Sequence, residues 1–430
     1  MMITDLPMDL VEEIISKIPV KSMKGVQLTC TMWNTLSKSQ ILTKMHLGKA
    51  FAPAKEDESR IIMMIDEKIY LTSVFVNNDV KDFSAEKIGQ LTCLEEQVKI
   101  SNVCQCEGLL LCMLKGDDTR VVVWNPYLGQ TRWIQLRRPH VPSGKTRHNM
   151  FSYGLGYENK MSGRSLKLLR FIDFSLFENK NEFLWYEIYD FESGLWTTLD
   201  VNPYWRVLTS GCGLSFKGNS YWCATKRNSE SGWREYQYID HIICFDYTRN
   251  RFGPLLRLPD RYDYVTLSCV REEKLAALCC RDDSDPYDFR IWITTLVEAG
   301  KVSWSKFLTF YQELHPDDIR FSFGGFYVDQ VKKVAMLSGR RVDDQGSMLA
   351  KTVCIIRWNK YEGGADLEEC TEESSWLKLV GSYVPSLVQV KEPKGGQRQK
   401  QSDLENFRYD EREFPSLYLR CKSLNPHFSV

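Results

Sequence analysis

Between residues 4 and 22 the apolar positions recur every three or four residues, which is the spacing of one face of a helix. The members of this stripe are Leu6, Leu10, Ile14, Ile15 and Ile18. Pro7 falls where a first helical turn tolerates proline, whereas Pro19 cannot continue a helix, so the pattern predicts a helix between them. A helix of about a dozen residues is marginal alone in water, so its apolar face needs a surface to pack on.

Two further short helices are expected before residue 46. Ser22 is placed to cap the second helix, and the third presents apolar side chains at spacings of three, namely Cys30, Trp33 and Leu36. A module of this size has a small core of its own. The polar run KEDESR at 55–60 is interpreted as a solvated loop that separates residues 1–46 from the rest of the chain.

From about residue 60 the pattern changes to short apolar runs rich in β-branched and aromatic residues, divided by polar turns. One unit recurs, in which an apolar strand leads through a polar turn to an aromatic residue. The clearest copies are GLLLCML with VVVWNPYLGQTRWIQL, WYEIYDFESGLWTTLDV, NSYWCAT with IICFDYTRNRFGPLLRLP, and KLAALCC with FRIWITTLVEAGKVSWSKFLTF. A further copy, KKVAMLSG with TVCIIRWNK, lacks the closing aromatic.

The closing aromatics, Trp133, Trp196, Phe252 and Trp304, lie about 50 to 60 residues apart, near the period of four-stranded kelch blades. The sequence therefore predicts an all-β, propeller-like domain over residues 60–390, with a β-sandwich of coincidental spacing as the alternative. SYVPSLVQV at 382–390 is expected to be its last strand. Residues 391–430 begin with a polar, basic and Gly-rich run and are expected to form a flexible tail.

Charge and composition exclude several classes of protein. Lysine plus arginine (56) equals aspartate plus glutamate (56), which gives no basic stripe for nucleic acid. Neither a secretory signal nor a membrane-spanning segment is visible. The fourteen cysteines are scattered, many within apolar runs, and are expected to be free thiols in the cytoplasm or the nucleus.

No catalytic constellation emerges from the chain. The six histidines are spread out, the cysteines never form Cys-x-x-Cys, and no nucleophile elbow or phosphate-binding loop is present. Paired carboxylates such as Asp282 and Asp283 are more often solvated loops than acid–base pairs. A radical-copper site, known in one kelch-type oxidase, needs a gathered Tyr, Cys and His that this sequence does not offer. We therefore expect no metal, no cofactor and no enzymatic activity.

The segment LPMDLVEEIISKIPVKSMKGVQLTCTMWNTL (6–36) strongly resembles an F-box: Leu-Pro, an amphipathic helix, Pro-Val and a Cys-x-x-Trp helix. CEGLLLC, VVVWNPYLGQTRWI, FKGNSYWCA, ICFDYTRNRFGP and SYVPSLVQV are similar to the F-box-associated domain of a large plant family. Together the resemblance covers roughly residues 1–390. It implies an α+β multidomain protein: a three-helix F-box at 1–46, a kelch-like β domain at 60–390, and a flexible tail.

The resemblance further implies an adaptor of a Skp–cullin–F-box (SCF) ubiquitin ligase. The F-box would dock on a Skp-type protein, and through it on cullin and RING subunits, while the β domain would recruit an unidentified target. Carried over residue by residue, the Skp-binding surface would comprise Leu6, Pro7, Leu10, Val11, Ile14, Ile18, Pro19, Val20, Leu28, Cys30, Trp33 and Leu36.

This chain departs from the family where basic residues commonly flank the Cys-x-x-Trp segment, since it has Gln27, Thr31 and Met32 there. An electrostatic contribution to docking is therefore in doubt, although the apolar anchors remain. Two alternatives stay open: a scaffold or competitor with a vestigial F-box, and a propeller enzyme. Co-purification of cullin and metal analysis would distinguish them.

Overall fold

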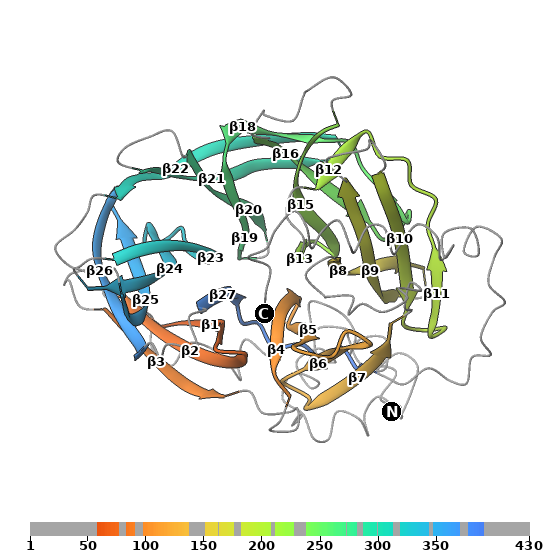
Figure 1. Ribbon diagram of the computed structural model, residues 1–430, viewed down its shortest axis with the longest axis horizontal. Coiled ribbons are helices and arrows are strands. Elements are labelled where there is room, and N and C mark those ends of the chain that lie inside the picture. Colours follow the sequence, from red (N-terminus) through yellow and green to blue (C-terminus); the bar gives the residue numbers. More distant parts are fainter. Residues whose placement is uncertain are drawn as a thin grey trace, which may run out of the picture.

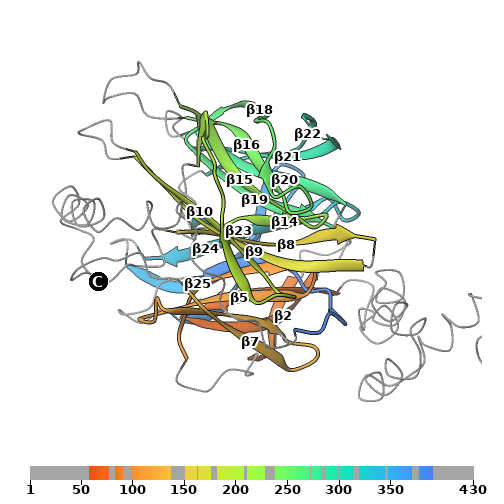
Figure 2. The ribbon, with the colours of Figure 1, turned by 90° about the vertical axis from the view of Figure 1, so that its right-hand side faces the viewer.

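The computed structural model describes residues 58–390 apart from 77–82, 91–97, 137–150, 162, 176–181, 208–210, 228–237, 272, 282–286, 299, 313–318, 344–346 and 370–376. All strands of this part belong to six sheets, arranged as the blades of a β-propeller around a central axis (Figure 1). Figure 2 shows blade 3 facing the viewer, between blade 4 above and blade 2 below. The predicted propeller is confirmed, and the β-sandwich alternative is wrong.

Blades 1 to 3 follow the chain from its first described strand. From the axis outward, blade 1 contains β27 (Leu377–Ser382), β1 (Glu58–Ile65), β2 (Lys68–Val76) and β3 (Phe83–Gln90). Blade 2 contains β4 (Ile100–Cys106), β5 (Leu109–Leu114), β6 (Arg120–Asn125) and β7 (Gln130–Gln135). Blade 3 contains β8 (Ser152–Lys160), β9 (Gly163–Ser175), β10 (Glu182–Asp190) and β11 (Leu195–Thr198), with β13 (Gly211–Cys212) added in parallel beside β8.

Blades 4 to 6 complete the ring. Blade 4 contains β12 (Trp205–Val207) and β14 (Leu214–Phe216) on one side of β15 (Asn219–Lys226), then β16 (Ile239–Asp246), which pairs with β17 (Arg251–Phe252) and β18 (Leu256–Tyr262). Blade 5 contains β19 (Tyr264–Val270), β20 (Lys274–Arg281), β21 (Tyr287–Glu298) and β22 (Lys301–Gln312). Blade 6 contains β23 (Ile319–Asp329), β24 (Val334–Val342), β25 (Met348–Arg357) and β26 (Lys360–Glu369).

The core lies between neighbouring blades, with one cluster of buried side chains at each of the six interfaces. Alternate residues of a strand point to opposite faces of its sheet. Accordingly Ile61 and Met63 of β1 pack toward blade 6, whereas Ile62 packs toward blade 2. Because both faces of a blade are buried, its strands read as continuous apolar runs, such as IIMMI and LLLCML.

The recurring sequence unit corresponds to the outer strands of a blade. Each of the four closing aromatics, Trp133, Trp196, Phe252 and Trp304, lies on a strand at the outer side of its sheet, respectively β7, β11, β17 and β22. In blades 2, 3 and 4 the turn before this aromatic is closed by a side-chain oxygen. In blade 3, Oδ1 of Asp190 accepts hydrogen bonds from the backbone N–H groups of Glu192 and Ser193. The polar turn of the repeat is therefore a specific backbone-capping device.

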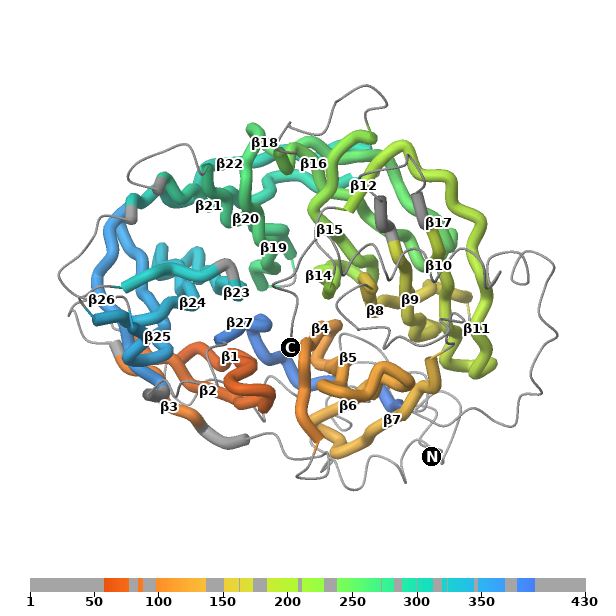
Figure 3. The backbone as a smooth tube through the Cα atoms, viewed as in Figure 1, coloured from red at the N-terminus to blue at the C-terminus, as the bar shows by residue number. Residues whose placement is uncertain are grey.

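The ring is closed by pairing the two ends of the described chain. β27 forms an antiparallel ladder with β1, from Leu377 opposite Ile65 to Ser382 opposite Ile61 (Figure 3). The expected last strand at 382–390 is wrong in its position: the strand ends at Ser382, and residues 383–390 form no ladder. Pro385 has no N–H to donate, which disfavours a continued strand there.

Residues 383–390 instead lie along the end of blade 2 as an extended strap. The Asn125 amide donates hydrogen bonds to the carbonyl oxygens of Ser386 and Val388, both at 2.8 Å. The backbone N–H of Val390 donates to Oε1 of Gln130 at 3.1 Å. The strap therefore extends the closure of the ring from blade 1 to blade 2.

The start of β1 also differs from expectation. The segment 55–60 was interpreted as a solvated loop, but Glu58 is buried and its carboxylate accepts hydrogen bonds from Oγ of Ser73 and from Nε of Arg60. The chain thus enters the propeller through an anchored residue.

Candidate interaction surfaces

The ring has two faces that differ in their connections. On one face, the turns join the two inner and the two outer strands of each blade; we call it the tight-turn face. Its described connections include residues 107–108, 126–129, 191–194, 217–218, 247–250, 330–333 and 358–359. The other face carries the connections between the middle strands and between successive blades; we call it the long-loop face.

Both ends of the described chain lie on the tight-turn face. The hairpin after β1 contacts the start of β4 on the long-loop face, because the N–H of Ile100 donates to the carbonyl of Glu67. Because β1 ends on the long-loop face, it begins, at Glu58, on the tight-turn face. The strap ends there too, since it passes the turn at Gly108, where an added Cβ would meet the carbonyl oxygen of Val384.

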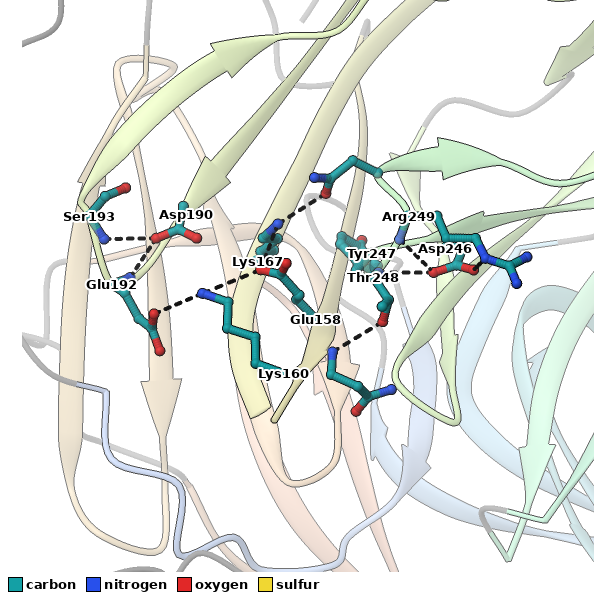
Figure 4. Close-up of polar contacts among 12 residues, drawn as sticks. Glu158, Lys160, Lys167, Asp190, Glu192, Ser193, Asp246, Tyr247, Thr248 and Arg249 are labelled. Carbon is teal, nitrogen blue, oxygen red and sulfur yellow. Dashed lines mark hydrogen bonds and ion pairs between the residues drawn. The ribbon is translucent and has the colours of Figure 1, made fainter. Parts of the chain in front are cut away.

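Charged side chains on the tight-turn face of blade 3 form a paired network that reaches Asn250 of blade 4 (Figure 4). Nζ of Lys160 lies 2.9 Å from Glu192 and 3.4 Å from Glu158. Nζ of Lys167 contacts the same Glu158 at 2.9 Å and Oδ1 of Asn250 in blade 4 at 3.0 Å. The Glu192 hydrogen bond raises the pKa of Lys160. This network joins the turns of two blades, because Lys167 of blade 3 bonds to Asn250 of blade 4.

Exposed large apolar side chains gather on the long-loop face of blades 4 to 6. They lie at strand ends or connections of that face, and they are Tyr204, Tyr238, Tyr264, Tyr311, Met348 and Leu349. Tyrosine is enriched at protein interfaces because it combines a large apolar ring with a hydrogen-bonding hydroxyl. Tyr238, at the end of the connection between β15 and β16, is exposed as well.

The thiols of the blade cores are poorly reactive. Burial raises the pKa of both Cys223 and Cys244 to about 12 and raises that of Cys279 well above its ordinary value. These groups remain protonated at neutral pH and are poor nucleophiles.

Among the described residues there is no group of three His, Cys, Asp or Glu side chains that could hold a metal ion, and no helix long and apolar enough to cross a membrane.

One expectation about the cysteines is wrong. Cys104 of β4 and Cys212 of β13 form a disulfide, with 5.4 Å between their Cα atoms and 108 residues between them in sequence. The other eight cysteines of the described part are free. The pairing depends on β13 lying beside the inner strands of blades 2 and 3, which sequence spacing does not reveal.

Lys378 of β27 is a half-buried cation beside Asn102 and Val103 of β4. Nζ of Lys378 in β27 donates hydrogen bonds to Oδ1 of Asn102 at 2.6 Å and to the carbonyl of Val103 at 3.1 Å. Burial lowers the pKa of Lys378 to about 8. Its contacts join the closing strand of blade 1 to the inner strand of blade 2, so its place is structural.

The Skp-binding residues expected from sequence lie in residues 1–57, outside the described residues. This holds for all of them: Leu6, Pro7, Leu10, Val11, Ile14, Ile18, Pro19, Val20, Leu28, Cys30, Trp33 and Leu36. The tail at 391–430 also lies outside the described residues. Both segments connect to the propeller on its tight-turn face, where the described chain begins and ends.

Comparison with known proteins identifies the family of this six-bladed propeller. A model described as the F-box associated beta propeller domain matches residues 60–390, and the F-box domain model matches residues 3–45. The chain therefore belongs to the F-box proteins that carry an F-box associated β-propeller domain.

Several relatives are similar along most of their length. An F-box/kelch-repeat protein of Arabidopsis thaliana is 49% identical over 438 residues, which cover 97% of each chain. An F-box protein of the same plant is 46% identical over 426 residues, covering 95% of this chain and 96% of its own. Among solved structures, a Hadza microbial sialidase matches 73% of this chain and 69% of its own at 11% identity; its TM-score of 0.37 is too low to carry an argument.

Proposed function

We propose that this protein is the substrate-recognition adaptor of an SCF-type ubiquitin ligase. Its F-box would dock on a Skp-type protein, and through it on cullin and RING subunits, while the propeller recruits a target protein for ubiquitination. The observation that carries the proposal is the match of residues 3–45 to the F-box model directly ahead of a closed propeller. Ubiquitin transfer would be catalysed by other subunits, so this chain would act without chemistry of its own.

The target-binding surface that the described residues favour is the long-loop face of blades 4 to 6. Its exposed side chains include Tyr204, Tyr264 and Tyr311. Both described chain ends lie on the opposite face, so neither end obstructs it. Aromatic residues of this kind are the commonest anchors of binding energy at protein interfaces.

We further propose that the protein acts in the cytoplasm, the nucleus or both, where SCF ligases would meet it. The eight free cysteines of the described part support this proposal, whereas the Cys104–Cys212 disulfide is of a kind that is rare in such reducing compartments.

The double substitution Leu6→Ala with Pro7→Ala tests the adaptor role. Loss of interface anchors typically costs 2 kcal/mol or more, about thirtyfold in affinity, so co-purification of the Skp-type protein and of cullin should be abolished. Tyr204→Ala, which removes an exposed propeller aromatic, serves as the matched control and should retain both partners. Undiminished pull-down by the double variant would refute the assignment of these residues, and wild-type protein that never retains cullin would indicate a scaffold outside any ligase.

A further inference from the structure

The tight-turn face of blade 6 bears an exposed apolar patch formed by two hairpin tips. Val331, in the turn between β23 and β24, is 69% exposed, and Trp358, in the turn between β25 and β26, is 67% exposed. Nζ of Lys333 lies 5.4 Å from the centre of the Trp358 ring, which links the two tips. We call Val331 and Trp358 the blade-6 patch.

The conformation of Trp358 is unusual for its size. The two-residue turn places Trp358 at φ 54° and Asn359 at φ 60°. Asparagine tolerates this left-handed region, whereas a bulky aromatic residue is rare there. The turn is held by Oδ1 of Asn359, which accepts a hydrogen bond from the N–H of Thr309 in blade 5. The turn therefore holds a large, mostly exposed apolar ring at a defined place on the surface.

The neighbouring turn is equally fixed and its surroundings are basic. Oδ1 of Asp329 accepts hydrogen bonds from the N–H groups of Val331 and Lys332. Arg271 of blade 5 lies 4.0 Å from Asp329, and Lys332 and Lys333 follow Val331 directly. Arg271, Lys332 and Lys333 together outnumber the single carboxylate of Asp329, so these side chains leave an excess of positive charge near the blade-6 patch.

The chain enters the propeller beside this patch. Blade 1 follows blade 6 around the ring (Figure 1). Nζ of Lys332 donates a hydrogen bond to the carbonyl of Val76, at the tight-turn end of β2. Ser59, next to the entry residue Glu58, hydrogen-bonds Tyr327 of β23 and so favours the charged form of that tyrosine, although burial raises its pKa overall. The segment that precedes Glu58 therefore starts next to blade 6.

The sequence before Glu58 carries apolar side chains and is long enough to reach this surface. Residues 47–57 read LGKAFAPAKED, in which Phe51 and Pro53 are apolar, the acidic pair Glu56 and Asp57 lies next to the entry, and Lys49 and Lys55 balance its charge. Phe51 lies seven residue steps before Glu58, and an extended chain spans about 3.3–3.6 Å per step, so Phe51 can reach roughly 23–25 Å from the entry. Neighbouring sheets pack about 10 Å apart, well within that reach.

From these observations we infer that residues 47–57, the connection between the F-box and the propeller, dock on the blade-6 patch. Phe51 and Pro53 contact Val331 and Trp358, while Glu56 and Asp57 pair with Lys332 and Lys333. The docked connection holds the F-box at a fixed orientation to the propeller, on the face opposite the exposed tyrosines. A target on the long-loop face is thereby held at a defined place relative to the Skp-binding module.

Tryptic cleavage of the full-length protein, bound to a Skp-type adaptor, tests the inference, because Lys49 and Lys55 lie within the segment. Trp358→Ala with Val331→Ser should speed cleavage at these lysines by roughly tenfold, the effect of losing one anchor contact. Phe51→Ser should do the same. Tyr311→Ala, which removes a 56% exposed aromatic from the opposite face, is the matched control and should leave the rate unchanged.

A second measurement identifies the occupant directly. With the photo-crosslinking residue benzoylphenylalanine at position 358, illumination should join that position to a peptide from residues 47–57 of the same molecule. A crosslink to a second copy, to the Skp-type protein or to a target would overturn the inference, as would cleavage rates that the patch variant does not change. These outcomes are separate from the adaptor role, because the patch variant should still retain the Skp-type protein, whereas failure of that role removes Skp binding from the wild type.

Discussion

At the scale of single residues, the position that closes the outer hairpin of a blade shows what an amide adds when it replaces a carboxylate. Asp190 and Asp246 close the outer hairpins of blades 3 and 4 through two backbone N–H groups each. Blade 2 has Asn125 at this position, and its Oδ1 closes the turn in the same way. Only the amide can also donate, and its two hydrogens bind the strap at Ser386 and Val388.

Asn125→Asp should therefore destabilise the propeller although the turn itself is preserved. The carboxylate cannot donate to the two strap carbonyls, and its charge lies against their oxygens, so we expect a loss of about 2–3 kcal/mol in the free energy of unfolding. Urea denaturation followed by tryptophan fluorescence measures it. Asp190→Asn is the matched control and should cost less than about 1 kcal/mol. Equal losses in the two variants would show that the strap contributes nothing.

At the scale of elements, the closing strand depends on a bulge in its neighbour. The β23–β24 ladder shifts register between Phe321 and Phe326, and Gly325 lies in this bulge at φ 104°. An added Cβ there would lie 2.0 Å from the carbonyl oxygen of Leu379 in β27. The glycine therefore allows β23 of blade 6 to approach the strand that closes blade 1.

Gly325→Ala should cost at least about 3 kcal/mol, because the new methyl group collides with the β27 backbone in addition to adopting an unfavourable φ. Gly129→Ala is a close control: Gly129 also has a positive φ, of 63°, but nothing lies within 4 Å of its added Cβ. That control should lose only about 1 kcal/mol. Thermal denaturation of both variants compares them, and a similar loss in each would mean that β27 does not need the close approach.

At the scale of the whole molecule, two kinds of link hold a ring whose blades contact mainly their neighbours. The β27–β1 ladder joins the last described strand to the first. The Cys104–Cys212 disulfide joins the inner strand of blade 2 to β13, which pairs with β8 of blade 3 on its way to blade 4. A contact across 108 residues restricts the unfolded chain strongly.

Cys212→Ser should lower the free energy of unfolding by about 2–4 kcal/mol. Guanidinium denaturation with and without a reducing agent provides an internal control. Reduction should bring the wild type to the level of the variant and should leave the variant unchanged. If the wild type unfolds identically in both conditions, the disulfide is absent from the native protein, and the expectation of free thiols would be correct after all.

Much of the molecule was accessible from sequence because its strands and turns are local. The runs around Trp133, Trp196, Phe252 and Trp304 identified the outer strands, and their spacing identified a propeller, which the structure confirms. The F-box family followed from a contiguous motif and is supported by the match at residues 3–45. The Skp-binding residues stay a prediction, since they lie outside the described part of the chain.

Sequence alone determined the hairpins, since an Asx-capped turn and a closing aromatic need only a few consecutive residues. Tertiary structure decided everything that joins distant segments: six blades, β27 against β1, the strap on Asn125, the Cys104–Cys212 disulfide, and the faces on which the chain ends and the exposed aromatics lie. The physical reason is that these contacts require the ring to close, and ring closure is a property of the summed geometry of all blades. The residue pattern of a single strand therefore does not predict ring closure.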